Sequence, residues 1–336
     1  MERKRNVKAW ALLFRPWSYT ATLVPFLVSA GFVVGTNASR LDWTGWCLGL
    51  LAGLFLQATV NLLNTWGDER SGVDDVPGAI RTTPQVHDGL VSMRAVFAAA
   101  VVCAGLGAVL GAVACIRPAE DGWSVNVPAL AAGAVGILGA TNYSTGVKFK
   151  YRGLGVPFVS FLMGPLETAA ALALLKPAVA WRVLEDPMAA ALAAAATAVV
   201  SLPVASLVGV IMHGNDMRDI PTDRAAGIVT FASRLGPRRA LAYYRFAHTV
   251  PYATCALFFV FRAVMGVVYG SWVDVAAGAE FVLLPAFCLP LTIKTLRTAG
   301  RVYRENPESP PWRGLERASG LIHLVFGSLY ALAWAV

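Results

Sequence analysis

Charged residues are scarce in this chain of 336 residues. Only 14% of the residues are Asp, Glu, Lys or Arg, while 57% are hydrophobic. Soluble globular proteins usually contain about 25% charged and about 45–50% apolar residues. The composition therefore excludes an ordinary soluble enzyme and indicates a protein whose solvent is lipid.

Other signals are missing as well. No two of the five cysteines form a CxxC pair, and all lie in or beside apolar runs, which favours small buried side chains over disulfides or a metal cluster. No Walker A or Rossmann glycine pattern follows a strand, so nucleotide binding has no support. The placement of the net charge of +8 does not indicate nucleic acid as a partner. The cysteines are Cys47, Cys103, Cys115, Cys255 and Cys288.

Nine long apolar runs are present instead. Each is close to the length of about 20 residues that a helix needs to cross a bilayer. We therefore predict an all-α, polytopic membrane protein, a nine-helix bundle that forms one transmembrane domain over residues 1–336. The runs cover residues 18–36, 44–66, 92–115, 127–147, 154–175, 187–212, 246–268, 278–296 and 317–336.

Basic residues are distributed unevenly around these runs. If the loops alternate between two sides, only five of the 28 Lys and Arg residues fall on one of them. Lys and Arg concentrate on the cytoplasmic side of membrane proteins. We therefore expect a plasma-membrane protein with the N-terminus in the cytoplasm and the C-terminus outside. The N-terminal segment lacks a clean cleavage site and is predicted to be a retained first span. The five residues are Arg40, Arg117, Lys176, Arg182 and Arg262.

The second apolar run leads into an acid-rich segment. Asn61, Asn64 and Asp68 are spaced i, i+3 and i+7, which places them on one face of a helix. Asp74 and Asp75 follow beyond the expected end of that helix.

The sixth run leads into a second acid-rich segment on the same side of the membrane. Asn215, Asp219 and Asp223 are spaced i, i+4 and i+8, again on one face, and Asp216 lies one step round from Asn215. Pro221 predicts a kink or a fresh helix start, because proline removes a helical hydrogen bond.

Two acidic clusters at the ends of spans suit one kind of chemistry. Mg²⁺ prefers oxygen ligands and is usually held by a few carboxylates together with water and phosphate oxygens. Ions between the clusters could bind a diphosphate and neutralise the charge that develops as it leaves. The alternative is that the acids are solvated loop charges, but ionisable groups at membrane depth are costly and usually functional.

The two segments resemble the motifs of the UbiA superfamily of intramembrane aromatic prenyltransferases. The nearest likeness is to the 1,4-dihydroxy-2-naphthoate polyprenyltransferase branch, which serves menaquinone synthesis. The resemblance implies nine transmembrane helices with Asp-rich motifs after the second and sixth. It is carried by Asn61, Asn64, Asp68, Gly72 and Asp74 in the first motif, and by Asn215, Arg218, Asp219, Asp223, Arg224, Gly227 and Thr230 in the second. Further matches are Arg15-Pro16, Tyr151-Arg152-Gly153-Leu154-Gly155 and Gly164-Pro165.

Two positions depart from that branch. Thr65 stands where the first motif has Asp, which removes one expected carboxylate, although its hydroxyl, Asp74 or Asp75 could take over. Ile228 stands where the branch usually has Lys, which could weaken diphosphate binding or mark a different acceptor.

The clusters and the resemblance together define the expected site. The catalytic carboxylates are expected to be Asp68, Asp74, Asp219 and Asp223, and these four with Asn64 and Asn215 are expected to hold Mg²⁺. Substrate binding is expected of Asn61, Asn64, Arg81, Lys148, Tyr151, Arg152, Asn215, Arg218 and Arg224. The rule that places basic residues in cytoplasmic loops would explain Lys148 and Arg152 equally well. Glu167, inside the fifth run, could orient or deprotonate an acceptor, or hydrogen-bond to another helix.

The expected function is Mg²⁺-dependent transfer of a polyprenyl group from polyprenyl diphosphate to an aromatic acceptor. The resemblance implies 1,4-dihydroxy-2-naphthoate, with loss of carbon dioxide, and 4-hydroxybenzoate, homogentisate or a lipid alcohol are alternatives. A membrane transporter is the alternative from another class, but its site would lie at broken helices near the midplane. The bilayer is the other expected partner, and no obligatory protein partner is evident.

Overall fold

The structure, a computed structural model, describes residues 2–36, 39–71, 86, 89–119 and 122–336. Within them the chain is almost entirely helical, which confirms the all-α fold class. One short antiparallel hairpin was not predicted: strand β1 (Ile116–Ala119) pairs with β2 (Gly122–Val125), with Ile116 opposite Val125.

The helices follow in the order of the chain. They are α1 (Glu2–Leu13), η1 (Pro16–Ser18), α2 (Thr20–Gly35), α3 (Trp43–Ser71), α5 (Met93–Cys115), α6 (Val127–Asn142), η3 (Phe149–Tyr151), α7 (Gly155–Phe161), η4 (Leu162–Leu166), α8 (Glu167–Leu175), α9 (Pro177–Glu185), α10 (Pro187–Ala225), α11 (Phe231–Val268), α12 (Trp272–Ala286), α13 (Leu289–Glu305) and α14 (Leu315–Ala335).

Among the described residues, six helices are long and apolar enough to cross a membrane: α3, α5, the α7–α8 segment, α10, α11 and α14. The bent pairs α1 with α2 and α12 with α13 raise the number to eight if each pair is one span. Helix α6 is apolar but only 16 residues long. Every predicted run coincides with one of these elements, and the count of nine spans stays a prediction.

Two details of the prediction were wrong, both at prolines. The run 278–296 is not one helix, because α12 ends at Ala286 and α13 begins at Leu289 with a bend of 50°. Pro285 lies next to the end of α12, where its missing N–H weakens the helix. Conversely, α10 continues through Pro221 without a fresh start. A single lost backbone hydrogen bond does not end a helix whose other bonds are kept.

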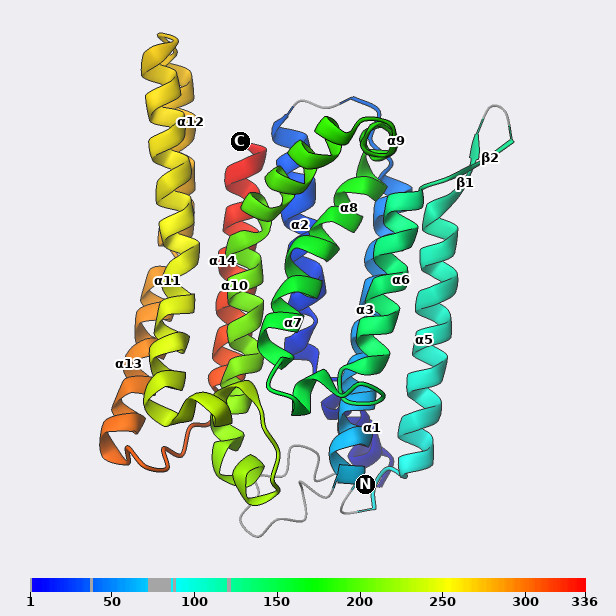
Figure 1. The fold of residues 1–336 in the computed structure, drawn as a ribbon, viewed down its shortest axis with the longest axis vertical. Helices are drawn as coiled ribbons and strands as arrows, with labels where there is room; N and C mark the ends of the chain where they lie inside the picture. The colour runs from blue at the N-terminus through cyan, green and yellow to red at the C-terminus, as the bar shows by residue number, and fades with distance from the viewer. Residues whose placement is uncertain (1, 37–38, 72–85, 87–88, 120–121) are drawn as a thin grey trace.

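The helices stand side by side as a bundle (Figure 1). Helix α1 lies at one end, called the α1 end here, and the C-terminus lies at the other. Helix α3 packs on α5, α10 packs on α11 and α14, and α2 lies against both α14 and α8. At 39 residues, α10 is about 58 Å long, which is more than the bilayer core requires. Its last turns therefore carry the second acid-rich segment to the α1 end.

Helices α2 and α14 approach closely because glycines line their contact. A Cβ atom on Gly31 would overlap the carbonyl oxygen of Ala331, and one on Gly35 would overlap that of Trp334. Small residues let helix backbones come together in lipid, where packing drives association. This contact joins an early helix to the last one and so closes the bundle.

We predict that Gly31→Ala lowers the thermal unfolding midpoint of the detergent-purified protein. The added methyl group overlaps the Ala331 carbonyl, and overpacking of this kind costs about 1–3 kcal/mol. Gly105→Ala in α5 is the matched control, since nothing lies within 4 Å of its Cβ and alanine favours a helix by about 1 kcal/mol over glycine. The unfolding midpoints are measured by circular dichroism. Equal midpoints for the two variants would contradict the close contact between α2 and α14.

Candidate functional site

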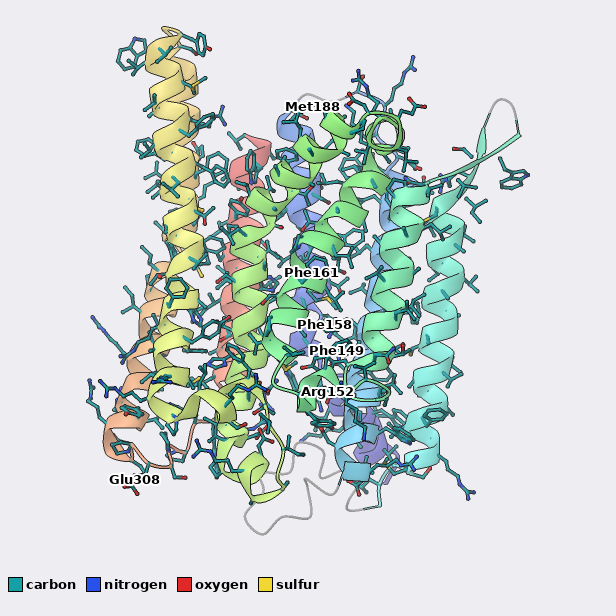
Figure 2. All side chains as sticks on the ribbon, viewed as in Figure 1. Phe149, Arg152, Phe158, Phe161, Met188 and Glu308 are labelled. Carbon is teal, nitrogen blue, oxygen red and sulfur yellow. The ribbon has the colours of Figure 1, made fainter. Side chains whose placement is uncertain are left out.

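Both acid-rich segments lie at the α1 end. Helices α3 and α10 each finish there, at Ser71 and Ala225 (Figure 1). The connection between α6 and α7, which includes η3, lies on the same side of the bundle, where Figure 2 labels Phe149 and Arg152. Three segments that are far apart in the sequence therefore meet.

One face of the last turns of α3 is polar and buried. Asn61, Asn64 and Asp68 are only 4%, 5% and 6% exposed. The Asn61 amide donates hydrogen bonds to the carbonyl oxygen of Phe14 and to Ser18 Oγ, both at 2.8 Å. Asn61 thus holds the turn before α2 against α3, and its predicted contact with substrate stays a prediction.

Asp68 is the charged end of this face. Its Oδ1 accepts hydrogen bonds from Lys150 Nζ and from the Tyr151 hydroxyl, each at 2.6 Å. Lys150 Nζ also donates to Asn64 Oδ1 at 3.0 Å. Hydrogen bonds between ionised groups are short and strong, so these contacts fix η3 against α3.

The pKa values around Asp68 follow from burial and charge. Burial disfavours the Lys150 ammonium, but the Asp68 carboxylate outweighs burial, so the pKa of Lys150 is raised and the side chain is charged. Burial raises the pKa of the Tyr143 hydroxyl, and the carboxylates of Asp216 and Asp68 raise it further. Tyr143 is therefore a neutral phenol beside a charged lysine.

The facing side of α10 carries three carboxylates. Asp216, Asp219 and Asp223 are spaced i, i+3 and i+7, with Asp216 and Asp223 buried and Asp219 half-buried. Arg218 binds Asp219 through two hydrogen bonds of 2.7 Å. The same guanidinium lies 3.7 Å from Oε1 of Glu316, the buried acid at the start of α14. The positive charge of Arg218 therefore compensates carboxylates on two helices, α10 and α14.

The next helix orients Asp223. Thr230, the N-cap of α11, donates from Oγ1 to Asp223 Oδ2 at 2.8 Å. The same Oγ1 accepts the backbone N–H of Ser233, whose own hydroxyl accepts the N–H of Thr230 in a capping box. The Thr230 hydroxyl thus caps the N-terminus of α11 and also positions the Asp223 carboxylate of α10.

The polar faces of α3 and α10 lie within electrostatic reach of each other. Asp223 interacts with the charges of Lys150 and Asp68, and Asp216 interacts with that of Lys150. These interactions define one charged region, made by the ends of α3 and α10 and by η3.

Arg15 adds a further cation to the charged region. It lies in the turn after α1, in a left-handed backbone conformation with φ of 50°. Its charge interacts with Asp68 and Asp219, and its guanidinium lies 3.5 Å from Thr65 Oγ1.

The loops that cover the charged region are joined to each other. Arg152 and Val229 form an isolated parallel β-bridge, and Arg234 donates to the carbonyl oxygen of Arg152 at 3.0 Å. The loop after α6 and the loop after α10 therefore form one surface.

The remaining predicted site residues lie at the margin of the charged region or outside the described residues. Lys148, Arg152 and Arg224 are exposed, and Asn215 is half-buried. Arg224 donates to the carbonyl oxygen of Ser233. Asp74 and Arg81 lie outside the described residues. The roles proposed for all of these stay predictions.

Four members of the charged region, Arg15, Tyr143, Lys150 and Asp216, were not among the predicted site residues. For Asp216 a signal existed: Asp216, Asp219 and Asp223 repeat the i, i+3, i+7 spacing of the first cluster. For Lys150 there was none, because the loop after α6 has no helical period to separate it from Lys148.

An apolar cavity of about 250 Å³ begins beside the charged region. It lies among α2, α3, α5, α6 and the α7–α8 segment. Tyr143, a neighbour of Asp68 and Lys150, lines the near end, and the walls reach Cys115 and Ala129 at the far ends of α5 and α6. Most of the lining side chains are alanine, glycine or leucine.

Glu167 belongs to this cavity and not to the charged region. It lies in the wall beside Thr22 of α2. Its Oε2 has no hydrogen-bond partner among the described residues. The predicted role of Glu167 toward an acceptor stays a prediction.

The acids fit an ion that a substrate helps to hold, rather than a prebuilt metal cage. Among the described residues, no three His, Cys, Asp or Glu side chains gather as a metal site. Mg²⁺ usually takes one or two carboxylates and completes its shell with water and phosphate oxygens. Asp216, Asp219 and Asp223 supply such carboxylates from one side.

These features define a polytopic helical membrane protein whose charged site opens on an apolar cavity. The sequence profile of the UbiA prenyltransferase family matches residues 22–299, a stretch that includes both acid-rich segments and η3. The chain belongs to the UbiA prenyltransferase family, and the expectation of a prenyltransferase is confirmed at that level.

Two relatives and one solved structure show the extent of the likeness. The chain is 26% identical over 332 residues to the UbiA prenyltransferase domain-containing protein 1 homolog of Drosophila melanogaster, covering 98% of this chain and 79% of the relative. It is 30% identical over 238 residues to the 1,4-dihydroxy-2-naphthoate octaprenyltransferase of Mycobacterium tuberculosis, covering 70% and 73%. A UbiA homolog from Archaeoglobus fulgidus bound to GPP and Mg²⁺ matches with a TM-score of 0.59 at 16% identity, covering 97% and 99%. At that identity the match shows the fold.

We predict that Thr230→Val lowers the thermal unfolding midpoint, because valine can neither cap α11 nor donate to Asp223. Loss of an N-cap costs about 0.5–2 kcal/mol. Thr230→Ser keeps the hydroxyl and should retain most of the wild-type stability. If the valine variant unfolds at the same temperature as the serine variant, the hydroxyl does not have the role described.

Proposed function

We propose that this chain transfers an isoprenoid group from a prenyl diphosphate to an aromatic acceptor, with Mg²⁺ as cofactor. One observation carries the proposal: the α10 carboxylates and the Asp68–Lys150 pair adjoin an apolar cavity that begins at Tyr143. A prenyl diphosphate has a charged head and an apolar tail, and the two halves of the site match them. The Archaeoglobus fulgidus homolog, whose fold this chain shares, was solved with GPP and Mg²⁺.

The charged region suits a diphosphate head group through charges of both signs. Asp219 and Asp223, with Asp216 beside them, would hold Mg²⁺, which when bound supplies positive charge to the phosphate oxygens. Lys150 and Arg15 can donate N–H bonds to the same head group from the α3 side. As the C1–O bond of the donor breaks, negative charge grows on the leaving diphosphate, and cations already in place stabilise it.

The carbon chemistry belongs at the junction of the charged region and the cavity. Loss of diphosphate leaves an allylic cation, and an electron-rich ring carbon of the acceptor attacks it. The ring then loses a proton, or a carboxyl group as carbon dioxide. Apolar walls exclude water, which would otherwise capture the cation. The Tyr143 hydroxyl is buried at this junction without a partner among the described residues, so it is placed to contact the acceptor.

We infer 1,4-dihydroxy-2-naphthoate as the acceptor and menaquinone biosynthesis as the setting. The motif resemblance supports this, as does the name of the Mycobacterium tuberculosis relative. The name of the Drosophila melanogaster relative states no acceptor. Because Thr65 and Ile228 depart from the branch, 4-hydroxybenzoate, homogentisate and a lipid alcohol are the alternatives to assay.

The position of the acids favours an enzyme over a transporter. Transporter sites lie near the bilayer midplane at broken helices, whereas Asp68 and Asp223 lie in the last turns of continuous helices. We further propose that residues 1–336 form a single domain in the plasma membrane, with the α1 end in the cytoplasm as the basic residues predict.

Product formation tests the proposal. The purified chain, given Mg²⁺, mixed prenyl diphosphates and the candidate acceptors, should yield a prenylated aromatic, and a chelator should abolish it. Asp219→Ala should lower the rate by about 100-fold or more, because it removes a carboxylate that stabilises the departing charge through the ion. Glu185→Ala, an exposed acid at the end of α9, is the control and should keep full activity.

Each outcome of this assay has a distinct meaning. A prenylated naphthoquinol product supports the inferred acceptor. A product from another aromatic acceptor supports the mechanism but assigns the chain to a different branch of the superfamily. No transfer to any acceptor by a folded chain contradicts the proposal and makes a transporter the better hypothesis.

The cavity should limit the length of the prenyl chain. Gly136 lines it, and nothing lies within 4 Å of a Cβ built there, so the side chain of Gly136→Leu starts in open space and takes up room in the cavity. We expect this variant to lower the rate with geranylgeranyl relative to geranyl diphosphate by about 10-fold or more, the usual effect of a steric mismatch in an apolar pocket. Gly105→Leu, on the exposed face of α5, is the control. If the ratio of the geranylgeranyl to the geranyl rate is the same in both variants, the prenyl tail does not occupy this cavity.

A further inference from the structure

The apolar cavity contains one acid that lies far from the charged region. Among the described residues that line the cavity, Glu167 carries the only carboxyl group, and it lies beside Thr22 of α2. Its Oε2 is buried and has no hydrogen-bond partner in the described part of the chain. Ionisable side chains at membrane depth are costly and usually functional. No step of the proposed transfer uses this acid.

The depth of the acid follows from α3, which passes both Glu167 and the charged region. A Cβ built on Gly53 of α3 would lie 3.2 Å from Glu167 Oε1, so the carboxyl group is level with Gly53. Asp68 comes 15 residues later in the same helix, which is about 22 Å at 1.5 Å per residue. Glu167 is therefore too far from Asp68 to contact a diphosphate held there.

The cavity closes one turn beyond the acid, on the side of α3. Gly49 lies one turn from Gly53, and a Cβ on Gly49 would overlap Leu174 Cδ1. The same Cβ would lie 3.4 Å from the ring of Phe26. Both Leu174 and Phe26 are buried. They form the floor of the cavity here, and Glu167 lies just before it.

A prenyl tail of sufficient length reaches this acid. An extended isoprene unit spans about 5 Å, because it contains four carbon–carbon bonds of about 1.5 Å in a zigzag chain. With the diphosphate at the charged region, the two units of a geranyl tail end well short of Gly53. The four units of a geranylgeranyl tail, about 20 Å in all, extend to the level of Gly53 and cover Glu167 Oε2.

We propose that Glu167 is a specificity residue, which limits the length of the donor's prenyl tail by making the inner end of the cavity polar. The inference rests on the proposed function. A short tail leaves Oε2 open to water, for which a cavity of about 250 Å³ has room. A long tail covers the oxygen with methyl and methylene groups, and a polar group buried without a hydrogen bond is costly. The longer donor then binds more weakly, although its diphosphate and its reacting carbon are the same.

Rates with donors of two lengths test the inference. The value of kcat/KM is measured with geranyl and with geranylgeranyl diphosphate. Glu167→Met replaces the carboxyl group with an apolar chain of similar length, so the geranylgeranyl-to-geranyl ratio should rise by about 10-fold or more. Glu167→Gln keeps a polar end and should retain a ratio close to that of the wild type. Glu185→Met, an exposed position at the end of α9, is the matched control and should leave the ratio unchanged.

The wild-type chain provides a second measurement. Dicyclohexylcarbodiimide is an apolar reagent that adds to carboxyl groups within membranes, and mass spectrometry of the digested chain locates the adduct. The chain is first saturated, with Mg²⁺ present, with an unreactive donor analogue, either geranyl or geranylgeranyl S-thiolodiphosphate. The geranylgeranyl analogue should protect Glu167 from the reagent, whereas the geranyl analogue should leave it reactive.

The opposite results separate this inference from the proposed function. An unchanged ratio in Glu167→Met overturns the inference alone, even if both rates fall, because a merely structural role would lower them equally. Equal labelling of Glu167 with the two analogues, or no labelling without either, also overturns it, and this result does not depend on the folding of any variant. No prenyl transfer from either donor by the folded wild type contradicts the proposed function and the inference with it.

Discussion

The hydrogen bonds from Lys150 and Tyr151 to Asp68 hold the charged region in place. They join the last turns of α3 to the loop after α6 across more than 80 residues of sequence. That loop is tied in turn to the loop before α11 through Arg152. The loop after α6 is held further by the stacking of Phe149 on Phe158, and the loop before α11 by the hydrogen bond from Thr230 to Asp223. A buried acid–base contact thus positions groups from both halves of the chain.

The helices beneath the charged region give the site its contrast between polar and apolar surroundings. Glycine and alanine leave space among α3, α5 and α6, while α2 and α14 close the bundle through glycine contacts. Polar groups are concentrated at one end and the cavity walls are almost wholly apolar. This division places the charged head group of a prenyl diphosphate in polar surroundings and its tail in apolar surroundings, within one site.

Much of the fold could be predicted because lipid imposes a simple pattern. Long apolar runs must be helical in a bilayer, so each predicted run coincides with a helix or a bent pair. Helical spacing likewise predicted Asp68, Asp219 and Asp223 as site residues, because residues three or four apart share one face of a helix. The hairpin of β1 and β2 was missed because it lies outside the membrane pattern.

The rest of the site depends on tertiary contacts that a sequence pattern does not contain. Lys148 and Lys150 are equivalent in the sequence, and only the path of the loop after α6 decides which one reaches Asp68. The rotation of α10 about its axis decides that Asp216 is more buried than Asn215. Pro221 disrupts α10 less than its chemistry suggests, because the remaining hydrogen bonds of the helix are kept.

The central claim is that the ends of α3 and α10 form the two walls of one diphosphate site. A cryo-electron microscopy structure of the chain with Mn²⁺ and geranyl S-thiolodiphosphate tests it most directly. The account predicts diphosphate density between Lys150 and the carboxylates of Asp219 and Asp223, with the prenyl tail running past Tyr143 into the cavity. Density for the analogue elsewhere, with the cavity empty, would contradict it.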